Sequence, residues 1–288
     1  MRRLEALRRL QARMESFGIP PEEAQAEARY ALATVLDCSV GQLYLEGQRE
    51  VSAAEEARLL ELLRRREQKE PLAYILGERS FMGLSFFVRP GVLIPRQETE
   101  LLVEQALSKM RMEGLQRVLD LCTGSGCIAV SLAKLGGAEV CASDISPEAL
   151  EVAAINAQRQ QVEVRFVKSD LFEKLPERYD LITANPPYIT RAAYAGLSPE
   201  VRDYEPRLAL LGGEDGLDLY RRIAREAPRH LRAGGYLAQE IGYDQAEAVA
   251  GLLHAQGFSQ VQLERDYAGL DRIVWARWPG DGSENTDV

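Results

Sequence analysis

Residues that bind metals or form disulfides are scarce in this chain of 288 residues. It contains two histidines and four cysteines, the latter at Cys38, Cys122, Cys127 and Cys141. No two cysteines have the Cys-x-x-Cys spacing of a zinc or redox motif, and the two histidines complete no zinc-site pattern with them. The sequence therefore predicts no metal site.

Long hydrophobic runs are also absent. No segment approaches the roughly 20 apolar residues that cross a bilayer, and Met1–Glu5 carries arginines and an acid where a signal peptide would be apolar. Hydrophobic residues make up 46% of the chain, enough to fill the cores of an enzyme-sized domain and a smaller partner. We therefore expect a globular, cytoplasmic protein that is not associated with a membrane, and a monomer.

A surplus of positive charge is the third missing feature. The chain has 35 Lys and Arg residues against 44 Asp and Glu residues, a formal net charge of −9. Proteins that hold a phosphate backbone usually present a basic face, because counterion release supplies most of the affinity. Nucleic acid is therefore disfavoured as a partner, although a local basic patch would be compatible with this composition.

Residues 1–75 have the periodicity of a small helical bundle. Apolar residues recur every three or four positions from Leu4 to Met14, and the pattern resumes after Pro20-Pro21. The segment Ser52–Glu55 has capping-box spacing ahead of a third helix, and Pro71 is expected to end the helical region. We interpret the run Arg64–Arg66 as a solvated helix face offset by neighbouring glutamates; the alternative is a docking surface for a partner.

Residues 76–96 are expected to form a β-hairpin connector with its turn at Pro90-Gly91, because aromatic and β-branched residues lie around that dipeptide. Residues 97–278 then alternate between strand and helix patterns. The fold class expected is α/β, with a mostly parallel Rossmann-like sheet covered on both faces, beside the N-terminal helical bundle. The tail, residues 279–288, is rich in Gly, Ser, Asn and Asp and is expected to be flexible.

The expected elements of the larger domain can be placed by their periodicity. Strands are predicted at 117–121, 139–143, 162–168, 179–184, 235–240, 258–264 and 271–277, and helices at about 97–110, 126–135, 147–159, 216–231 and 244–256. Ser146 is the expected N-cap of the third helix, with Pro147 at its first position. The last two strands have no room for a crossover helix between them and should pair antiparallel.

A glycine-rich turn marks the expected cofactor site. The strand Val118–Leu121 breaks into Cys122-Thr123-Gly124-Ser125-Gly126 and then a helix. Glycines let the backbone approach a ligand, and the helix N-terminus offers unpaired N–H groups to a carboxylate or phosphate. Asp144, which ends the next strand, can accept the ribose hydroxyls of an adenosyl group. Asp170 can accept from the adenine amino group, with Leu171 and Phe172 against the ring.

This turn does not identify the ligand by itself. The segment Gly124–Ala129 also fits the looser Gly-x-Gly-x-x-Ala pattern of dinucleotide-binding proteins, so NAD remains an alternative at this point. Asp144 has a structural alternative as well, as an acid at the N-terminus of the helix that follows Ser146-Pro147.

The segment Asn185-Pro186-Pro187-Tyr188 follows the fourth strand, at the edge where open α/β sheets bind ligands. Two prolines fix φ and remove two backbone donors, so their carbonyls are set in direction. An amide or exocyclic amino nitrogen is a poor nucleophile because its lone pair is delocalised. Asn185 Oδ1 and the Pro186 carbonyl can each accept one N–H of such a group and aim its lone pair at a methyl carbon, while Tyr188 stacks on it. The structural alternative is an ordinary Asn-Pro turn with a core tyrosine.

Several segments together resemble the bacterial release factor glutamine N5-methyltransferases over nearly the whole chain. The matching residues are Phe81–Leu84, Leu93–Glu100, Asp120–Gly126, Asn185–Ile189 and Glu205–Leu217. The resemblance implies S-adenosylmethionine as cofactor and, as substrate, the glutamine of the Gly-Gly-Gln loop in peptide chain release factors 1 and 2. On this resemblance, residues 1–75 are expected to dock the protein substrate. Two departures occur: Cys122 stands where many methyltransferases have glycine, acceptable if its φ is negative, and Leu171 where an aromatic is sometimes found.

The same resemblance assigns roles to individual residues. It implies that Arg96 and Thr99 belong to the active-site wall, that the glycine turn with Asp144, Leu171 and Asn185 contacts the cofactor, and that Asn185–Tyr188 forms the glutamine pocket. The alternative for Arg96 and Thr99 is a helix N-terminus with a salt bridge to Glu100. Alternative substrates are a ribosomal-protein glutamine or, against the net charge, adenine N6 in nucleic acid. A non-catalytic adenosyl- or NAD-binding module is the third class.

Overall fold

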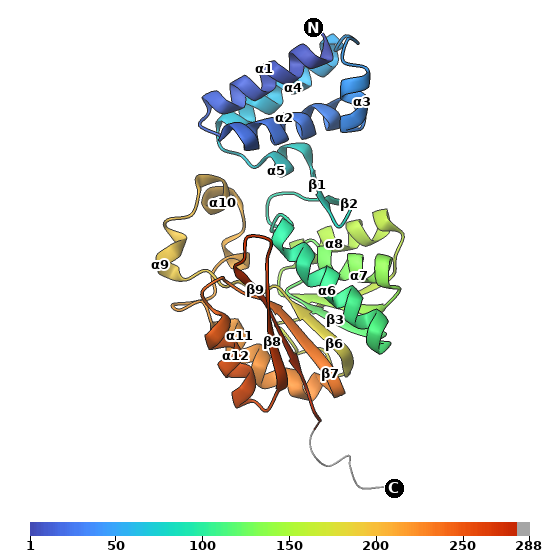
Figure 1. The fold of residues 1–288 in the computed structure, drawn as a ribbon, viewed down its shortest axis with the longest axis vertical. Coiled ribbons are helices and arrows are strands. Elements are labelled where there is room, and N and C mark those ends of the chain that lie inside the picture. The colour runs from blue at the N-terminus through green and yellow to red at the C-terminus, as the bar shows by residue number, and fades with distance from the viewer. Residues whose placement is uncertain (281–288) are drawn as a thin grey trace. The chain divides into compact units, whose positions relative to one another are not determined.

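The computed structural model describes residues 1–280 (Figure 1), which divide into two compact units. The first unit comprises residues 1–78 together with the remote segment 198–204, and the second comprises 79–197 and, among the described residues, 205–280. No sequence pattern indicated that a segment from the middle of the larger domain would join the first unit. The expected flexible tail lies, from residue 281 on, outside the described residues.

Helices build the first unit. They are α1 (Arg3–Ser16), α2 (Pro21–Val35), α3 (Val40–Leu45), α4 (Ala53–Glu67), α5 (Leu72–Leu76) and, from the remote segment, α10 (Pro199–Tyr204). Leucine, alanine and methionine side chains from α1, α2 and α4 form its core. The predicted capping box at α4 is confirmed, since Ser52 Oγ accepts the Glu55 N–H and the Glu55 carboxylate accepts the Ser52 N–H. The expectation that Pro71 ends the helical region is wrong: Pro71 is the N-cap residue of α5.

The interpretation of Arg64–Arg66 as a solvated face is wrong for its last member. Arg66 has no exposed surface. It lies on the same face of α4 as buried Leu59 and Leu62, seven and four positions earlier, because the helix repeats every 3.6 residues. A buried guanidinium must be paired, and Arg66 binds Glu27 of α2 at 2.8 and 2.9 Å and Glu200 of α10 at 2.7 Å. Arg64, in contrast, is exposed.

The predicted hairpin exists, but its turn is elsewhere. Strands β1 (Glu78–Phe81) and β2 (Leu84–Phe87) pair as a two-stranded sheet. The loop between them is Met82-Gly83, and both residues have positive φ, +52° and +73°, as a two-residue hairpin loop of the primed type requires. Pro90-Gly91 follows the hairpin and does not make its turn.

The second unit is built on a seven-stranded sheet with the order β5-β4-β3-β6-β7-β9-β8. Its strands are β3 (Arg117–Leu121), β4 (Glu139–Asp144), β5 (Val164–Lys168), β6 (Tyr179–Ala184), β7 (Leu231–Glu240), β8 (Ser259–Arg265) and β9 (Asp271–Arg277). All neighbours from β5 to β7 are parallel, whereas β9 is antiparallel to both β7 and β8. The predicted fold class and the antiparallel pairing of the last two strands are therefore confirmed.

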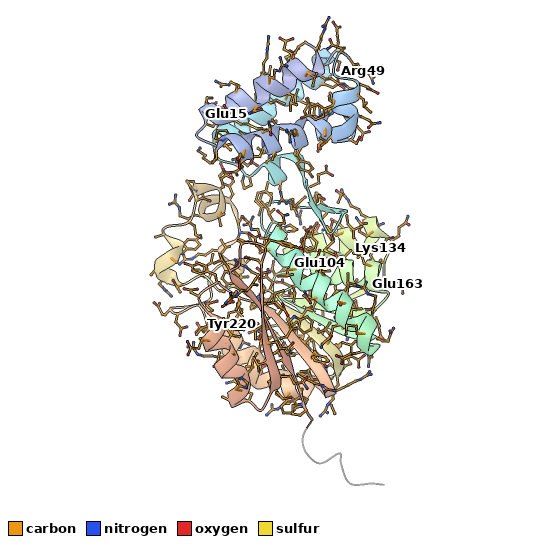
Figure 2. The ribbon with its side chains drawn as sticks, viewed as in Figure 1. Glu15, Arg49, Glu104, Lys134, Glu163 and Tyr220 are labelled. Carbon is orange, nitrogen blue, oxygen red and sulfur yellow. The ribbon has the colours of Figure 1, made fainter. Side chains whose placement is uncertain are left out.

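Helices cover both faces of this sheet (Figure 1). One face carries α6 (Gln97–Glu113), α7 (Cys127–Gly136) and α8 (Pro147–Gln160), and the other carries α11 (Asp218–Glu226) and α12 (Ala246–Ala255). Glu104 on α6 and Lys134 on α7 are exposed on the outer side of their layer (Figure 2). The helix predicted at 216–231 is shorter than expected, because a 3-10 turn, η2 (Ala227–His230), follows α11 and β7 begins at once.

The sheet register brings three strand ends to one edge. Leu121 of β3 pairs with Ser143 of β4 on one side and with Ala184 of β6 on the other. The glycine turn, Asp144 and Asn185 come directly after these residues and therefore lie at the same edge of the sheet. The chain beyond Asn185 forms α9 (Arg191–Tyr194) and η1 (Arg207–Ala209) before it returns to α11. Among residues 1–280, no helix is long and apolar enough to cross a membrane.

Candidate active site

A cavity of about 360 Å³ opens at this edge, and its walls come from the second unit alone. Most of the residues predicted for the cofactor and the substrate line it: Arg96, Thr99, Cys122, Thr123, Gly124, Ser125, Asp144, Asp170, Leu171, Asn185 and Pro187. Residues far apart in the sequence thus share one cavity of the size that ligand sites have.

Four predicted residues lie behind the cavity wall. Gly126 is the N-cap of α7, and a Cβ there would come within 2.9 Å of the Ala153 Cβ. Pro186 is buried, and Tyr188 packs against the core on the α11 side of the sheet. Phe172 is buried in that same core and stacks on His230 with ring centroids 4.5 Å apart. The structure therefore leaves Leu171, and not Phe172, facing a ligand in the cavity.

Buried Asp120 holds the glycine turn in place. Its carboxylate accepts the hydroxyl of Thr123, in the turn, at 2.6 Å and that of Thr183, on β6, at 2.8 Å. Burial raises the pKa of Asp120 to about 7, against the lowering effect of these two hydrogen bonds. The turn after β3 is thereby joined to the strand that carries Asn185.

Asp144 ties the same turn to the next loop. One of its carboxylate oxygens accepts the Gly124 N–H at 2.9 Å, and the other accepts the Ser146 N–H at 2.9 Å. The predicted N-cap is confirmed, because Ser146 Oγ accepts the Ala149 N–H. Each Asp144 oxygen keeps acceptor capacity, since a carboxylate offers about four lone-pair sites, and the residue faces the cavity.

Two non-glycine residues on the cavity wall have left-handed backbone conformations. Cys122 has φ +55° and Leu171 has φ +50°. The condition stated for Cys122, a negative φ, is therefore not met: the turn after β3 has the conformation that glycine favours, and the backbone of Cys122 is strained. Burial raises the pKa of the Cys122 thiol, and that of the Cys127 thiol to about 12, so both remain protonated and neither is a nucleophile.

Asp170 has a partner that the sequence did not indicate. Arg222 of α11 binds its carboxylate at 2.9 Å, and both side chains are about one-third exposed on the cavity wall. A single ion pair uses part of the capacity of a carboxylate, so Asp170 can still accept from a ligand. The pair also fixes the direction of the Asp170 carboxylate.

The second half of the chain closes around the loop Asn185–Tyr188. Ile189 and Leu211 form a parallel bridge, and Gln245 Nε2 donates to the Tyr188 carbonyl at 3.1 Å. Gly212 lies so close that a Cβ there would be 2.6 Å from the Pro187 carbonyl oxygen. The glycine-rich run near Gly212 was a signal in the sequence for this close approach, but sequence reasoning gave it no role.

Arg96 is the N-cap residue of α6 and Thr99 lies in its first turn, as the structural alternative expected, but Arg96 pairs with Glu205 and not with Glu100. Arg96 binds the carboxylate of nearly buried Glu205, which also accepts the Ile94 N–H at 3.1 Å. Glu100 instead accepts the Met82 N–H at 2.6 Å. Arg96 is thereby held on the cavity wall by the segment that follows the Asn185–Tyr188 loop.

Thr99, in the first turn of α6, joins Asn185 to a buried acid. Its hydroxyl donates to Glu240 Oε2 at 2.6 Å and accepts from Asn185 Nδ2 at 3.2 Å. Glu240 ends β7 and is 2% exposed. Sequence reasoning missed Glu240, which is 141 positions from Thr99 in the chain.

No cluster of three or more metal-ligating side chains occurs within residues 1–280.

Comparison with known proteins gives consistent matches. A family model described as PrmC N-terminal domain matches residues 5–77, and one described as methyltransferase small domain matches residues 96–196. A release factor glutamine methyltransferase from Cereibacter sphaeroides is 46% identical over 284 residues, covering 97% of this chain and 99% of that protein. One from Bordetella pertussis is 47% identical over 257 residues, covering 88% and 94%.

Solved structures support the fold. The crystal structure of a methyltransferase from Pyrococcus furiosus superimposes with a TM-score of 0.53 at 19% identity and covers 80% of this chain and 100% of its own. At that identity the likeness concerns the fold alone, and it agrees with a methyltransferase-type α/β sheet in the second unit.

Proposed function

The chain belongs to the family of release factor glutamine methyltransferases, and on that premise we propose that it transfers a methyl group from S-adenosylmethionine to a release-factor glutamine. The expected target is the side-chain amide nitrogen in the Gly-Gly-Gln loop of release factors 1 and 2. The observation that carries the proposal is the placement of the Asn185 amide on the wall of the cavity that also holds the glycine turn and Asp144.

The cavity wall fits the proposed cofactor. Asp144 offers carboxylate oxygens to ribose hydroxyls, Asp170 offers one to the adenine amino group, and Leu171 offers an apolar surface to the ring. Ser143 Oγ also lies at this wall, buried and without a hydrogen-bond partner among the described residues. A buried hydroxyl without a partner costs free energy, so a polar ligand atom at this position would be favoured. When bound, the cofactor supplies an electrophilic methyl group on a sulfonium.

The protein's task at the nitrogen is orientation. Asn185 Oδ1 and the Pro186 carbonyl are proposed to accept the two N–H groups of the glutamine amide, which aims the nitrogen lone pair at the methyl carbon. A bond forms from nitrogen to carbon as the carbon–sulfur bond breaks. The nitrogen becomes acidic on methylation and then loses its proton, so no strong base is required. Burial, followed by the charge of Glu240, raises the pKa of Tyr188 to about 12, so its hydroxyl stays neutral.

The first unit is proposed to dock the release factor. Residues 5–77 match a domain model described for this family, and they contribute nothing to the cavity wall. The proposal therefore separates recognition of the folded protein substrate from the chemistry at the amide. Function as a monomer in the cytoplasm belongs to the same proposal.

The direct test is transfer of labelled methyl from S-adenosylmethionine to purified release factor, followed by mass mapping of the labelled residue. We expect the label on the glutamine of the Gly-Gly-Gln loop and none on a factor in which this glutamine is replaced by alanine. Asn185→Ala should lower kcat by about 100- to 1000-fold, the usual cost of one catalytic hydrogen-bonding group, and leave cofactor affinity largely intact.

The outcomes are distinguishable. Label on a ribosomal protein and none on release factor would replace the proposed substrate and keep the chemistry. Label on adenine of DNA or RNA would replace both. Full activity of Asn185→Ala on the release factor would overturn the role given to this side chain.

A further inference from the structure

A relay of hydrogen bonds runs from the wall of the cavity into the protein core. Asn185 Nδ2 donates to Thr99 Oγ1 at 3.2 Å, and Thr99 Oγ1 donates to Glu240 Oε2 at 2.6 Å. The three residues come from the end of β6, the first turn of α6 and the end of β7. Asn185 and Thr99 line the cavity, whereas Glu240 does not and is 2% exposed.

The direction of this relay is fixed by its buried end. An ionised carboxylate only accepts hydrogen bonds, so the single hydroxyl hydrogen of Thr99 is used toward Glu240. The Thr99 oxygen can then only accept from Asn185. An Asn185 amide turned by 180° would present Oδ1 to an oxygen with no hydrogen left to give, and two acceptors would face each other. The orientation with Nδ2 toward Thr99 is therefore the satisfied one, and it leaves Oδ1 on the other side of the amide plane.

We propose that Glu240 is a positioning residue that, through Thr99, keeps the Asn185 amide oriented with its oxygen available to the substrate nitrogen. This inference rests on the proposed function of the Asn185–Tyr188 loop. With the amide turned, Nδ2 would face the N–H groups of the substrate and repel them. The sequence alone predicts Asn185 as the acceptor. An asparagine amide has nearly the same shape when turned by 180°, and Glu240 explains why the oxygen and not the nitrogen is presented to the substrate.

Other groups around Glu240 act on its charge but do not replace Thr99. Arg272 of β9 attracts the carboxylate electrostatically and is itself paired with Asp266 at 3.1 Å, while Glu98 repels it. Tyr220 of α11, labelled in Figure 2, donates its hydroxyl to the backbone carbonyl of Glu240 at 2.7 Å and leaves the carboxylate to Thr99.

The protonation state of Glu240 follows from its burial. Burial raises the pKa of Glu240 to about 7, although the hydrogen bond from Thr99 and the charge of Arg272 oppose the rise. Below that pH the protonated carboxyl can donate to Thr99, whose hydroxyl can then donate to Asn185 Oδ1 and favour the turned amide. Turnover should therefore rise with pH as Glu240 ionises.

Glu240→Gln tests the proposal. A neutral amide at position 240 can either donate to Thr99 or accept from it, so it no longer selects one direction. We expect kcat to fall by about 10- to 100-fold, less than the loss of the Asn185 group itself. The KM for cofactor and for release factor should stay within about threefold, because Glu240 does not reach the cavity. The rise of kcat with pH near 7 should disappear.

Two controls separate orientation from packing. Glu113→Gln removes a carboxylate at the far end of α6, where it binds Tyr236 and Lys109, and should retain the kcat and pH profile of the unaltered protein. Thr99→Ser keeps the hydroxyl of the relay and Thr99→Val removes it with nearly the same shape. The serine variant should exceed the valine variant in kcat by about tenfold or more.

Glu240→Gln with a kcat within about threefold of the unaltered protein and the same pH profile would overturn the proposal. If Glu240→Gln does not fold, as judged by loss of cofactor binding, equal turnover of the Thr99 serine and valine variants would overturn it. Failure of the proposed function looks different, because the unaltered protein would then transfer no methyl to the release factor. If another glutamine or adenine is methylated instead, the same variants are compared on that acceptor.

Discussion

At the scale of single residues, the second unit keeps two carboxyl groups in places where charge is costly. Asp120 has no exposed surface and Glu240 almost none, and burial raises the pKa of each to about 7. Both carboxyl groups accept hydrogen bonds from threonine hydroxyls. Asp120 accepts from Thr123 and Thr183, and Glu240 accepts from Thr99. The two acids hold the glycine turn and the Asn185 amide, both of which lie on the cavity wall.

The buried charge of Asp120 should make folding stability depend on pH. The pKa of Asp120 is raised from 3.8 to about 7 in the folded protein. The stability that goes with the neutral carboxyl is therefore complete below about pH 4 and is lost as the pH rises to about 7. Asp120→Asn cannot ionise. Its free energy of unfolding relative to the unaltered protein should increase by up to about 4 kcal/mol between these two pH values.

Urea unfolding at about pH 4 and about pH 7.5 measures this difference, and effects of other groups cancel between the two proteins. Asp203→Asn is the control, because Asp203 is exposed and the hydrogen bond from Arg202 lowers its pKa. The free energy of unfolding of Asp203→Asn, relative to the unaltered protein, should not increase between these two pH values. If the difference in free energy of unfolding between Asp120→Asn and the unaltered protein were the same at both pH values, the prediction would be contradicted, because ionisation of Asp120 would then not destabilise the folded protein.

The site residues that the sequence could indicate are those at strand ends. Asp144 and Asn185 follow predicted parallel strands, and such strands end at one edge of a sheet, so their proximity could be inferred. Arg222, Glu205 and Glu240 could not be inferred in this way. Arg96 and Glu205, for example, are 109 positions apart, and only the tertiary fold pairs them.

At the scale of elements, residues in left-handed conformations mark where sequence and geometry disagree. The C-cap residue of helix α8, Gln161, has φ +56° and an exposed side chain. Glycine is the residue usually found in this position, since other residues pay a steric cost in the left-handed region. The hairpin turn at Met82-Gly83 is a similar case, and it was missed because methionine carries no turn signal.

Replacing the residue that ends α8 should stabilise the protein. Gln161→Gly removes the steric cost of the positive φ and should raise the free energy of unfolding by about 1 kcal/mol, partly offset by the greater freedom of glycine in the unfolded chain. Ala154→Gly is the matched control, at an exposed position within the same helix, and should lower it by about 1 kcal/mol. Chemical denaturation of both variants gives the comparison. If both variants changed the free energy of unfolding in the same direction, the positive φ of Gln161 would not explain the effect of replacing it.

Element boundaries show the limit of periodicity. The strands β3, β6 and β9 have the predicted bounds, since each is a short apolar run between polar residues. Strand β7 begins four residues earlier than predicted, because the segment before it, Leu231–Gly234, is not apolar enough to indicate a strand. Pairing with neighbouring strands, and not local pattern, extends the strand there.

At the scale of the whole molecule, the chain completes its first unit with a segment that lies after the Asn185–Tyr188 loop. Residues 198–204 join residues 1–78, and the ion pair between Arg66 and Glu200 is one of the contacts that hold them. Burial raises the pKa of Glu27, the second partner of Arg66, so the guanidinium balances a carboxylate that is itself poorly solvated. No local pattern distinguishes Arg66 from its exposed neighbour Arg64, because the difference lies in which face of α4 is covered.

Arg66→Met should therefore destabilise the first unit without weakening cofactor binding by the second. Removing one member of a buried ion pair leaves an uncompensated charge, at a typical cost of about 3–5 kcal/mol. Arg64→Met, which loses only the exposed pair with Glu61, should be nearly neutral. Hydrogen exchange should locate the loss of protection in residues 1–78 and 198–204, while the Kd for S-adenosylmethionine stays the same, since the cavity is lined by the second unit. A parallel loss of cofactor affinity would show that the two units do not unfold independently.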